Sequence, residues 1–192
     1  ANPYSDITCL EAINLIGRNI VQAVNDPSEE NYDALMFAGM LAGIGFGNAG
    51  CHLPHGMSYA VAGLVKDYQP QGWPADHPMV PHGISVIVNS PAVFRKTGPA
   101  CPERHWEAAD AMGADLTGKN MEDGGEILAD QIISMMRDTG IPNGLSGVGY
   151  SMSDLDALTD RSFAQKRLID NGPLPVARNE LKELFHDAMR YW

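Results

Sequence analysis

Residues 34–65 contain no charged side chain, and this uncharged stretch constrains the fold more than any other feature of the chain. Its length and composition raise the question of a membrane span. The stretch nevertheless holds seven glycines together with Asn48, His52, Pro54 and His55, all of which are costly in lipid. A helix of small residues inside a helical core explains the same composition. We therefore expect a buried helix and no membrane span.

Helical periodicity extends through most of the 192 residues. Apolar side chains recur from Leu10 to Val24 at helical spacing, which predicts a helix over 5–24. The run Asp26-Pro27-Ser28-Glu29 predicts a second helix over about 27–47, with Asp26 as its N-cap. Further helices are expected at about 52–65, 102–112, 123–139, 154–159 (capped by Ser153) and 178–191. The sequence thus predicts an all-α protein, with residues 1–192 forming a single helical domain.

One apolar segment, residues 81–90, leaves two interpretations open. Its run of apolar residues fits a buried strand, and periodicity alone does not exclude this. Pro81 upstream and Pro91 as a stop signal also fit a short buried helix. The preceding residues 66–80 are polar and rich in proline, so we expect a loop there.

The run from Gly45 to Gly50 matches the pattern G-x-G-x-x-G. This pattern binds dinucleotides only where a β-strand precedes it and a helix follows it. The preceding residues are rich in Ala, Met and Gly, and Pro54 interrupts the first turns of the following helix. We therefore interpret the run as a glycine-rich helix end that allows Phe46 to approach a ligand.

The formal net charge of −11 argues against binding to nucleic acid or to an anionic membrane surface. Three cysteines without a C-x-x-C pair argue against a disulfide framework and a thiolate zinc site, and they suit a reducing compartment. We accordingly expect a cytoplasmic location. The chain begins at Ala1 without methionine or a targeting signal, as though cut from a longer protein.

Two histidines occupy nearly matching positions, His55 in Pro54-His55-Gly56-Met57 and His82 in Pro81-His82-Gly83-Ile84. Glycine after each histidine allows a metal ion or a cofactor ring to approach the backbone. Imidazole is the commonest protein ligand for zinc, iron, nickel and copper. Two histidines do not complete a tetrahedral site, so a carboxylate and a third imidazole would have to come from elsewhere. The alternative is a metal-free helical interaction module in which both histidines are structural.

The remaining histidines are weaker candidates for metal binding or catalysis. His52 and His55 share the i, i+3 spacing of one helical face, but we expect His52 to be hydrogen-bonded in the core. His77 lies in the polar loop, where it is solvated or serves as a proton relay. His105 and His186 lie on amphipathic segments and are expected at the surface.

Several stretches together resemble the iron-containing alcohol dehydrogenase family, in particular its hydroxyacid–oxoacid transhydrogenase-like branch. They are Gly43-Ile-Gly-Phe-Gly-Asn-Ala-Gly-Cys-His-Leu-Pro-His-Gly-Met-Ser-Tyr59, Asp76-His-Pro-Met-Val-Pro-His-Gly83, Ser90-Pro-Ala-Val-Phe94, Pro102-Glu-Arg-His105, Gly113-Ala-Asp115 and Val148-Gly-Tyr-Ser151. The resemblance covers nearly the whole chain, and the two histidine motifs are specific. The Gly-Phe-Gly-Asn-Ala-Gly run argues against the related glycerol dehydrogenases and dehydroquinate synthases.

The resemblance implies the C-terminal helical domain of a two-domain enzyme, whose N-terminal α/β domain binds NAD or NADP and is missing from this chain. It implies an Fe²⁺ or Zn²⁺ ion held by one Asp and three His. Two of these histidines match His55 and His82, and the other two ligands lie on a helix that the chain lacks. Phe46 matches a position that lines the pocket near the nicotinamide. Tyr59 matches a position where some members carry another histidine.

The implied reaction is metal-assisted hydride transfer between an alcohol or hydroxy acid and the nicotinamide, with an oxo acid as acceptor in the transhydrogenase branch. Lys66, Arg95 and Lys96 are candidates to bind a substrate carboxylate, and Tyr59 and His77 are candidate catalytic residues. We expect the 192-residue chain alone to lack dehydrogenase activity, and the complete enzyme to be a homo-oligomer.

Overall fold

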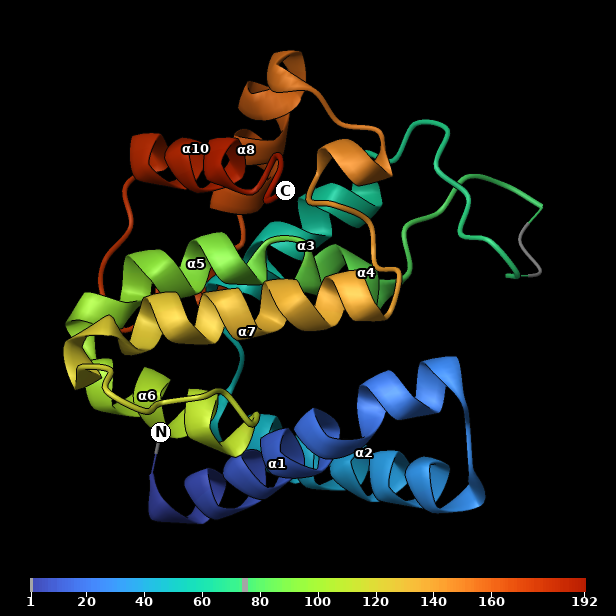
Figure 1. Cartoon of the computed structure of the whole chain (residues 1–192). Coiled ribbons are helices and arrows are strands. Elements are labelled where there is room, and N and C mark those ends of the chain that lie inside the picture. Colours follow the sequence, from blue (N-terminus) through green and yellow to red (C-terminus); the bar gives the residue numbers. More distant parts are fainter. Residues whose placement is uncertain (1, 74–75) are drawn as a thin grey trace. The chain divides into compact units, whose positions relative to one another are not determined.

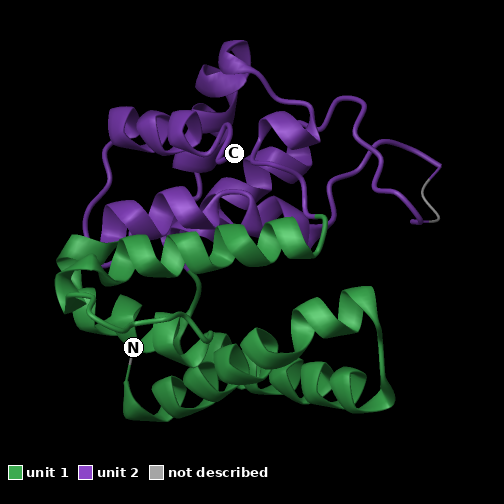
Figure 2. Cartoon of the chain, in the orientation of Figure 1, with its two compact units in different colours: residues 1–51, 98–140 green, residues 52–97, 141–192 purple. Residues whose placement is uncertain are grey.

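The computed structural model describes residues 2–73 and 76–192, and every regular element within these ranges is helical (Figure 1). The predicted all-α fold is therefore confirmed. Ala1, on which the interpretation of a cut chain depends, lies outside the described residues. Residues 1–51 and 98–140 form one compact unit, and residues 52–97 and 141–192 form a second (Figure 2).

The first unit, termed unit 1, is built on two long antiparallel helices. They are α1 (Pro3–Asn25) and α2 (Glu29–Ala49), which pack along each other (Figure 1). The helices α6 (Pro102–Ala111) and α7 (Gly124–Asp138) pack together, and α6 also contacts α1. Short 3₁₀ helices, η1 (Gly98–Ala100) and η2 (Met121–Asp123), connect these elements.

The start of α2 differs from the prediction. Asp26 is the C-terminal cap of α1, whereas Ser28 is the N-cap of α2 and its hydroxyl accepts a hydrogen bond from the Asn31 amide. The helix starts later because a serine followed by Glu29 and Glu30 satisfies the first amides and places acidic groups at the positive end of the helix dipole.

The three glycines of the apparent dinucleotide pattern have three different environments. Gly45 lies where α2 packs on α1, and a Cβ there would overlap the Cys9 Sγ. Gly47 has no described atom within 4 Å of the position that a Cβ would take. Gly50 is the C-cap, with φ of 78°. The pattern therefore belongs to the end of a helix, as expected, with a helix instead of a strand before it.

The second unit, termed unit 2, contains the short helices. They are α3 (Leu53–Gly63), α4 (His82–Ile87), α5 (Ser90–Thr97), η3 (Ser146–Val148), η4 (Met152–Asp154), α8 (Leu155–Phe163), α9 (Lys166–Ile169) and α10 (Arg178–Asp187). The helix α3 contacts α4, α8 and α9, and α10 contacts α5 and α8. The most deeply buried large side chains of this unit include Leu53, Met57, Val61, Leu158, Ile169, Leu181 and Phe185.

The segment predicted as either strand or helix is helical, but Pro91 does not end it. The helix α4 ends at Ile87, and Pro91 is the second residue of a new helix, α5. Proline is compatible with a first helical turn because its missing N–H would have no partner there. The predicted cap at Ser153 is also wrong, since Ser151 and Asp154 form a reciprocal capping box at η4.

No single helix among the described residues is long and apolar enough to cross a membrane. Among the described residues, α2 and α3 pass that test only when they are taken together, and a break separates the two helices.

Candidate metal-binding histidine pair

The fold brings His55 and His82 together within unit 2. His55 lies in the first turn of α3 and His82 is the first residue of α4, and these two helices pack against each other. The centroids of the two imidazole rings are 5.3 Å apart, and the ring planes are inclined by 58°. Twenty-six intervening residues, including the polar loop, thus separate two side chains that face each other.

A serine three residues after each histidine gives both sites the same backbone support. The Ser58 hydroxyl donates a 2.8 Å hydrogen bond to the His55 carbonyl, and the Ser85 hydroxyl donates one of the same length to the His82 carbonyl. Both serines are buried. The common motif is therefore Pro-His-Gly-apolar-Ser, one residue longer than the pattern noted in the sequence. The repeated serine was the signal that sequence reasoning missed.

The glycine after each histidine has a different role in the two motifs. A Cβ at Gly56 would lie 2.9 Å from Ile169 Cδ1, so this glycine allows α9 to pack on α3. A Cβ at Gly83 would meet no described atom within 4 Å. The expectation that both glycines keep space for a ligand is therefore wrong for Gly56, where a buried side chain fills that space.

The environment of His55 favours its neutral form. Partial burial lowers the pKa of the His55 imidazole, and the neighbouring His82 lowers it further. A neutral imidazole has a nitrogen lone pair available, which is the form that binds a metal ion.

The separation of the two rings fits ligands that share one ion. Imidazoles that bind an ion at about 2.1 Å and at a tetrahedral angle have ring centroids roughly 5 Å apart. The observed 5.3 Å agrees with this value. Residues 2–73 and 76–192 contain no cluster of three His, Cys, Asp or Glu side chains that could hold a metal. As candidate ligands, the two histidines would therefore form only part of a metal shell, since the described residues place no third such side chain with them.

Tyr59 and Phe46, two further candidates, are both half-exposed. Tyr59 lies on α3 four residues after His55, which places the two residues on neighbouring turns of one helix face, and its side chain is 47% exposed. Phe46 lies near the end of α2, in unit 1, and is 54% exposed.

The lysines proposed to bind a substrate carboxylate already have acidic partners. The Lys66 ammonium lies 2.6 Å from an oxygen of Asp154, whose pKa this hydrogen bond lowers. Lys96 donates a 2.8 Å hydrogen bond to Glu180, and this contact likewise lowers the pKa of that carboxyl group.

Arg95 and Lys96 line a cavity of about 520 Å³ between α5 and α10. Its other lining residues are Ala92, Glu180, Glu183, Leu184, His186, Asp187 and Arg190. Lys and Arg side chains thus equal Asp and Glu side chains in number, His186 aside, and neither histidine of the pair lines this cavity. The structure brings Arg95 and Lys96 together with α10 instead of with His55 and His82.

The other histidines lie in three kinds of environment. His77 is exposed and its Nδ1 lies 2.6 Å from Asp76 Oδ1, while His186 is exposed beside Asp187. His52 precedes α3 as its N-cap residue. His105 is only 7% exposed, so its expected surface position is wrong. Packing of unit 1 covers the ring, whose Nδ1 lies 3.0 Å from the Cys101 carbonyl oxygen at the start of α6.

Comparison with known proteins agrees with the motifs. Residues 1–189 match the family model of the C-terminal part of Fe-containing alcohol dehydrogenases. The mitochondrial hydroxyacid-oxoacid transhydrogenase of Xenopus laevis is 42% identical over 193 residues, which cover 100% of this chain and 42% of that protein. The human protein of the same name is 41% identical, with 100% and 41% covered. The chain therefore spans less than half the length of these relatives.

Solved structures show the same fold. A 1,3-propanediol oxidoreductase superimposes with a TM-score of 0.85 at 28% identity, covering 98% of this chain and 46% of that one. An alcohol dehydrogenase from Oenococcus oeni gives the same TM-score at 24% identity, with 97% and 45% covered.

The expected cytoplasmic location is wrong, because the relatives from Xenopus laevis, Homo sapiens and Dictyostelium discoideum are all named as mitochondrial. The cysteine pattern indicated only a reducing compartment, and this property does not identify the cytoplasm. The first residues of a chain that covers 42% of a relative also carry no information about that relative's targeting segment.

Proposed function

This chain belongs to the iron-containing alcohol dehydrogenase family, and from this premise we propose that it is the metal-binding part of an oxidoreductase. The proposed reaction is hydride transfer between an alcohol or hydroxy acid and NAD or NADP. The observation that supports it best is the convergence of His55 and His82 at 5.3 Å, within two matched Pro-His-Gly-apolar-Ser motifs.

The two histidines would supply two of four ligands to an Fe²⁺ or Zn²⁺ ion. When bound, such an ion supplies Lewis acidity at the substrate oxygen and lowers the pKa of the hydroxyl group. The imidazoles of His55 and His82 would each contribute one nitrogen lone pair to the ion. Ser58 and Ser85 would hold the backbone at each histidine, because their buried hydroxyls bind the carbonyls of the two ligands. The remaining carboxylate and imidazole would come from polypeptide beyond this chain.

Metal binding by the 192-residue chain provides the direct test. We expect weak binding of Zn²⁺ or Co²⁺ in calorimetric titration, since water would occupy the vacant half of the shell. The variants His55→Ala and His82→Ala should each abolish it, whereas His186→Ala, at an exposed histidine elsewhere in unit 2, should not. Equal binding by all three variants would contradict the proposed site. Submicromolar binding that depends on His55 would instead reveal a nearly complete local site.

The 42% identity to a named transhydrogenase supports a more specific candidate. In that function a hydroxy acid such as 4-hydroxybutyrate reduces a bound nicotinamide, and an oxo acid such as 2-oxoglutarate reoxidises it. Half-exposed Tyr59, beside His55, would then contact the substrate, and Phe46 would line the nicotinamide pocket. Lys66, Arg95 and Lys96 would bind the substrate carboxylate only after exchanging the partners that they have in this structure.

A chimera tests this candidate, with the upstream part of the Xenopus laevis relative joined to this chain. A transhydrogenase should convert 4-hydroxybutyrate and 2-oxoglutarate without added free dinucleotide, and His82→Ala should abolish turnover. A simple dehydrogenase would require added NAD or NADP. The 192-residue chain alone should be inactive in both assays. A chimera that folds but contains no metal by elemental analysis would favour the metal-free interaction module.

Two further proposals concern the whole protein. We propose a mitochondrial location, because the relatives are so named. We also propose a homo-oligomer, which sedimentation of the chimera would test.

A further inference from the structure

The two histidine helices share a further feature, three residues beyond the repeated serine. Val61 lies six residues after His55, and Val88 lies six residues after His82. The two stretches read Pro-His-Gly-Met-Ser-Tyr-Ala-Val and Pro-His-Gly-Ile-Ser-Val-Ile-Val. Both valines are fully buried, and the backbone carbonyl of each accepts a hydrogen bond from a tyrosine hydroxyl. The match between the motifs therefore extends to a valine that a tyrosine binds.

The two hydroxyls bind carbonyls at the ends of the histidine helices. Tyr150 donates a 2.6 Å hydrogen bond to Val61, in the last turn of α3. Tyr191 donates a 2.8 Å hydrogen bond to Val88, the C-cap of α4, and accepts one of 3.4 Å from the amide of Ala92 in the first turn of α5. Carbonyls at the end of a helix lack a partner within it, so a side-chain donor can satisfy them. Each hydroxyl thus fixes the end of one histidine helix.

Both tyrosines belong to one hydrogen-bonded frame within unit 2. Segment 143–150 carries Tyr150, and segment 188–192 carries Tyr191. Two backbone hydrogen bonds, of 2.9 and 3.0 Å, join the segments. The Tyr191 amide also donates a 2.8 Å hydrogen bond to the side-chain oxygen of Asn143. These two segments, termed the tyrosine frame, therefore connect the far end of α3 to the far end of α4.

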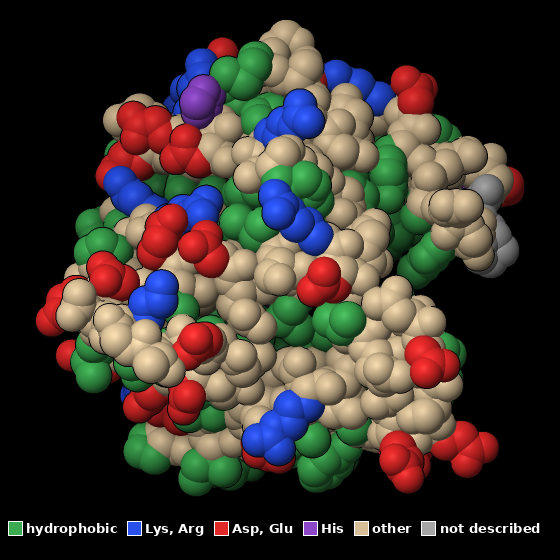
Figure 3. Space-filling view, viewed as in Figure 1, with side chains coloured by type: hydrophobic (Ala, Val, Ile, Leu, Met, Phe, Trp, Pro, Cys, Tyr) green, Lys and Arg blue, Asp and Glu red, His purple; other side chains and the backbone are tan. Residues whose placement is uncertain are grey.

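Both hydroxyls are protonated donors at neutral pH. Burial raises the pKa of Tyr150 to about 12, with a smaller contribution from Asp154. Burial likewise raises the pKa of Tyr191. Acidic and basic side chains lie next to each other over α5 and α10 (Figure 3), and near Tyr191 their effects on its pKa oppose each other, since Arg95 lowers it and Asp187 raises it. The two hydrogen bonds therefore do not depend on pH near neutrality.

We propose that Tyr150 and Tyr191 are positioning residues, which hold α3 and α4 so that the imidazoles of His55 and His82 meet at one metal ion. This inference rests on the proposed function. The helices have only 11 and six residues, and helices of this length depend on tertiary contacts for their stability. Each histidine lies at the start of its helix and each bound valine at or near its end. Release of the valine would therefore let the helix tilt and the imidazole move.

Local helix capping explains the arrangement less well. Caps are normally made by residues next to the helix end, whereas the tyrosines are 89 and 103 residues away from the valines that they bind. The remaining alternative is that the two hydroxyls only stabilise the fold. That alternative predicts no link between a hydroxyl and the geometry of the imidazoles, so the experiment separates geometry from stability.

The experiment uses the 192-residue chain and the variants Tyr150→Phe and Tyr191→Phe, each of which removes only a hydroxyl. All measurements are made at a temperature at which circular dichroism shows every protein folded. In the metal-free chain the imidazole protons of His55 and His82 should give a nuclear Overhauser cross-peak, because the ring centroids are 5.3 Å apart. Each variant should weaken or lose this cross-peak. In Zn²⁺ titrations followed by the imidazole resonances, each should also weaken binding by about tenfold or more, as does the loss of other groups that orient metal ligands.

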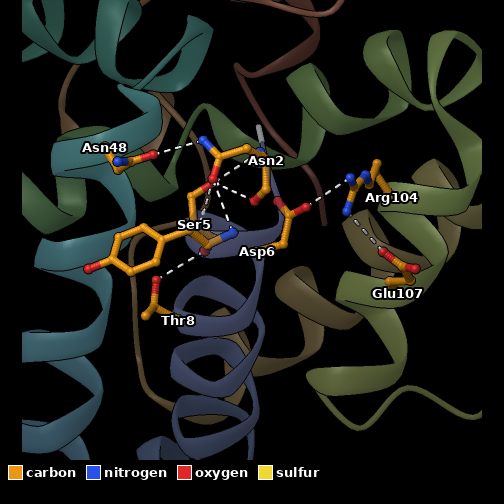
Figure 4. A network of polar contacts seen from close by, with 8 residues as sticks. Asn2, Ser5, Asp6, Thr8, Asn48, Arg104 and Glu107 are labelled. Carbon is orange, nitrogen blue, oxygen red and sulfur yellow. Dashed lines mark hydrogen bonds and ion pairs between the residues drawn. The ribbon is translucent and has the colours of Figure 1, made fainter.

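Thr159→Val and Thr8→Val are the matched controls. The Thr159 hydroxyl donates a 2.6 Å hydrogen bond to the Leu155 carbonyl in α8, and the Thr8 hydroxyl donates one of 3.0 Å to the Ser5 carbonyl in α1 (Figure 4). Each of these bonds lies within one helix, so its loss costs stability without releasing one helix from another. Neither control should change the cross-peak or the affinity for Zn²⁺.

A wild-type cross-peak in Tyr150→Phe or Tyr191→Phe would overturn the positioning role of that tyrosine. Loss of the cross-peak with unchanged affinity for Zn²⁺ would overturn the link to metal binding. An equal loss of affinity in the threonine controls would reduce the effect to stability and overturn the proposal. If the wild-type chain binds no Zn²⁺ through His55, the proposed function fails, whereas the cross-peak of the metal-free chain still decides whether the tyrosines position the rings.

Discussion

The two matched histidine motifs predict opposite effects for the same substitution, glycine to alanine. At Gly56 a new Cβ would lie 2.9 Å from Ile169 Cδ1 and 3.4 Å from Leu168 Cβ. Ile169 is fully buried, so its methyl group has little room to move. At Gly83 a new Cβ would meet no described atom within 4 Å. The helical context is similar, because both glycines directly follow the histidine near the start of a helix.

The magnitudes follow from two terms. Alanine in place of glycine stabilises a helix by up to about 1 kcal/mol. Overpacking a buried contact by one methyl group costs about 1–3 kcal/mol. Gly83→Ala should therefore raise the free energy of unfolding by up to about 1 kcal/mol, whereas Gly56→Ala should lower it by up to about 2 kcal/mol. The free energies of unfolding of the two variants should therefore differ by about 1–3 kcal/mol, which is the cost of overpacking at Gly56.

Urea unfolding followed by far-UV circular dichroism measures both variants, and Ile169→Val provides the cross-check. Removing Cδ1 costs about 0.5–1.5 kcal/mol in the wild type. In the Gly56→Ala background the same change should cost less, since it also removes the clash, which gives a coupling energy of about 1 kcal/mol. Equal stabilities of Gly56→Ala and Gly83→Ala, or additive effects of Gly56→Ala and Ile169→Val, would refute the assignment of Gly56 to helix packing.

Three further predictions concern buried or paired polar groups. Tyr150→Phe removes the hydroxyl that donates a 2.6 Å hydrogen bond to the Val61 carbonyl, and chemical denaturation should show a loss of about 1–3 kcal/mol. Lys66→Gln should cost less than about 1 kcal/mol near neutral pH, because Lys66 is 45% exposed. Lys66 lowers the pKa of Asp154, so the difference in unfolding free energy between Lys66→Gln and wild type should vanish as the pH falls through that lowered pKa. A difference that persists at low pH would contradict the pairing. Burial lowers the pKa of His105, so acidification below its ordinary value of about 6.5 should destabilise the wild type more than His105→Gln, as thermal melts at several pH values would reveal.

Helix type and approximate extent could be predicted from the sequence because they depend on local patterns. The apolar stripe from Leu10 to Val24 predicted α1 to within two residues at its start and one at its end. Boundaries set by competing polar residues were less predictable. Asp26 and Ser28 are both good caps, and only the backbone geometry of the α1–α2 connection decides that Ser28 starts the helix.

The burial of individual side chains could not be predicted from the sequence either, because it depends on which helices pack together. His105 lies on an amphipathic segment and was expected at the surface, yet packing of unit 1 buries it. The local sequence does not distinguish a histidine on the solvent-facing side of a helix from one whose ring packs back against the start of its own helix. The sequence likewise did not distinguish Gly56, which is packed, from Gly83, which is open, because the atom that fills the space beside Gly56 belongs to Ile169, more than a hundred residues away.

By itself, the sequence determined that the chain is helical, which family it resembles, and which two histidines are the candidate ligands, because these properties follow from periodicity and short motifs. Only the tertiary structure decided that His55 and His82 face each other at 5.3 Å, and that Gly56 is packed against Ile169 whereas Gly83 is open. These are distances between residues remote in sequence, or spaces left empty by the whole fold, and no local pattern specifies them.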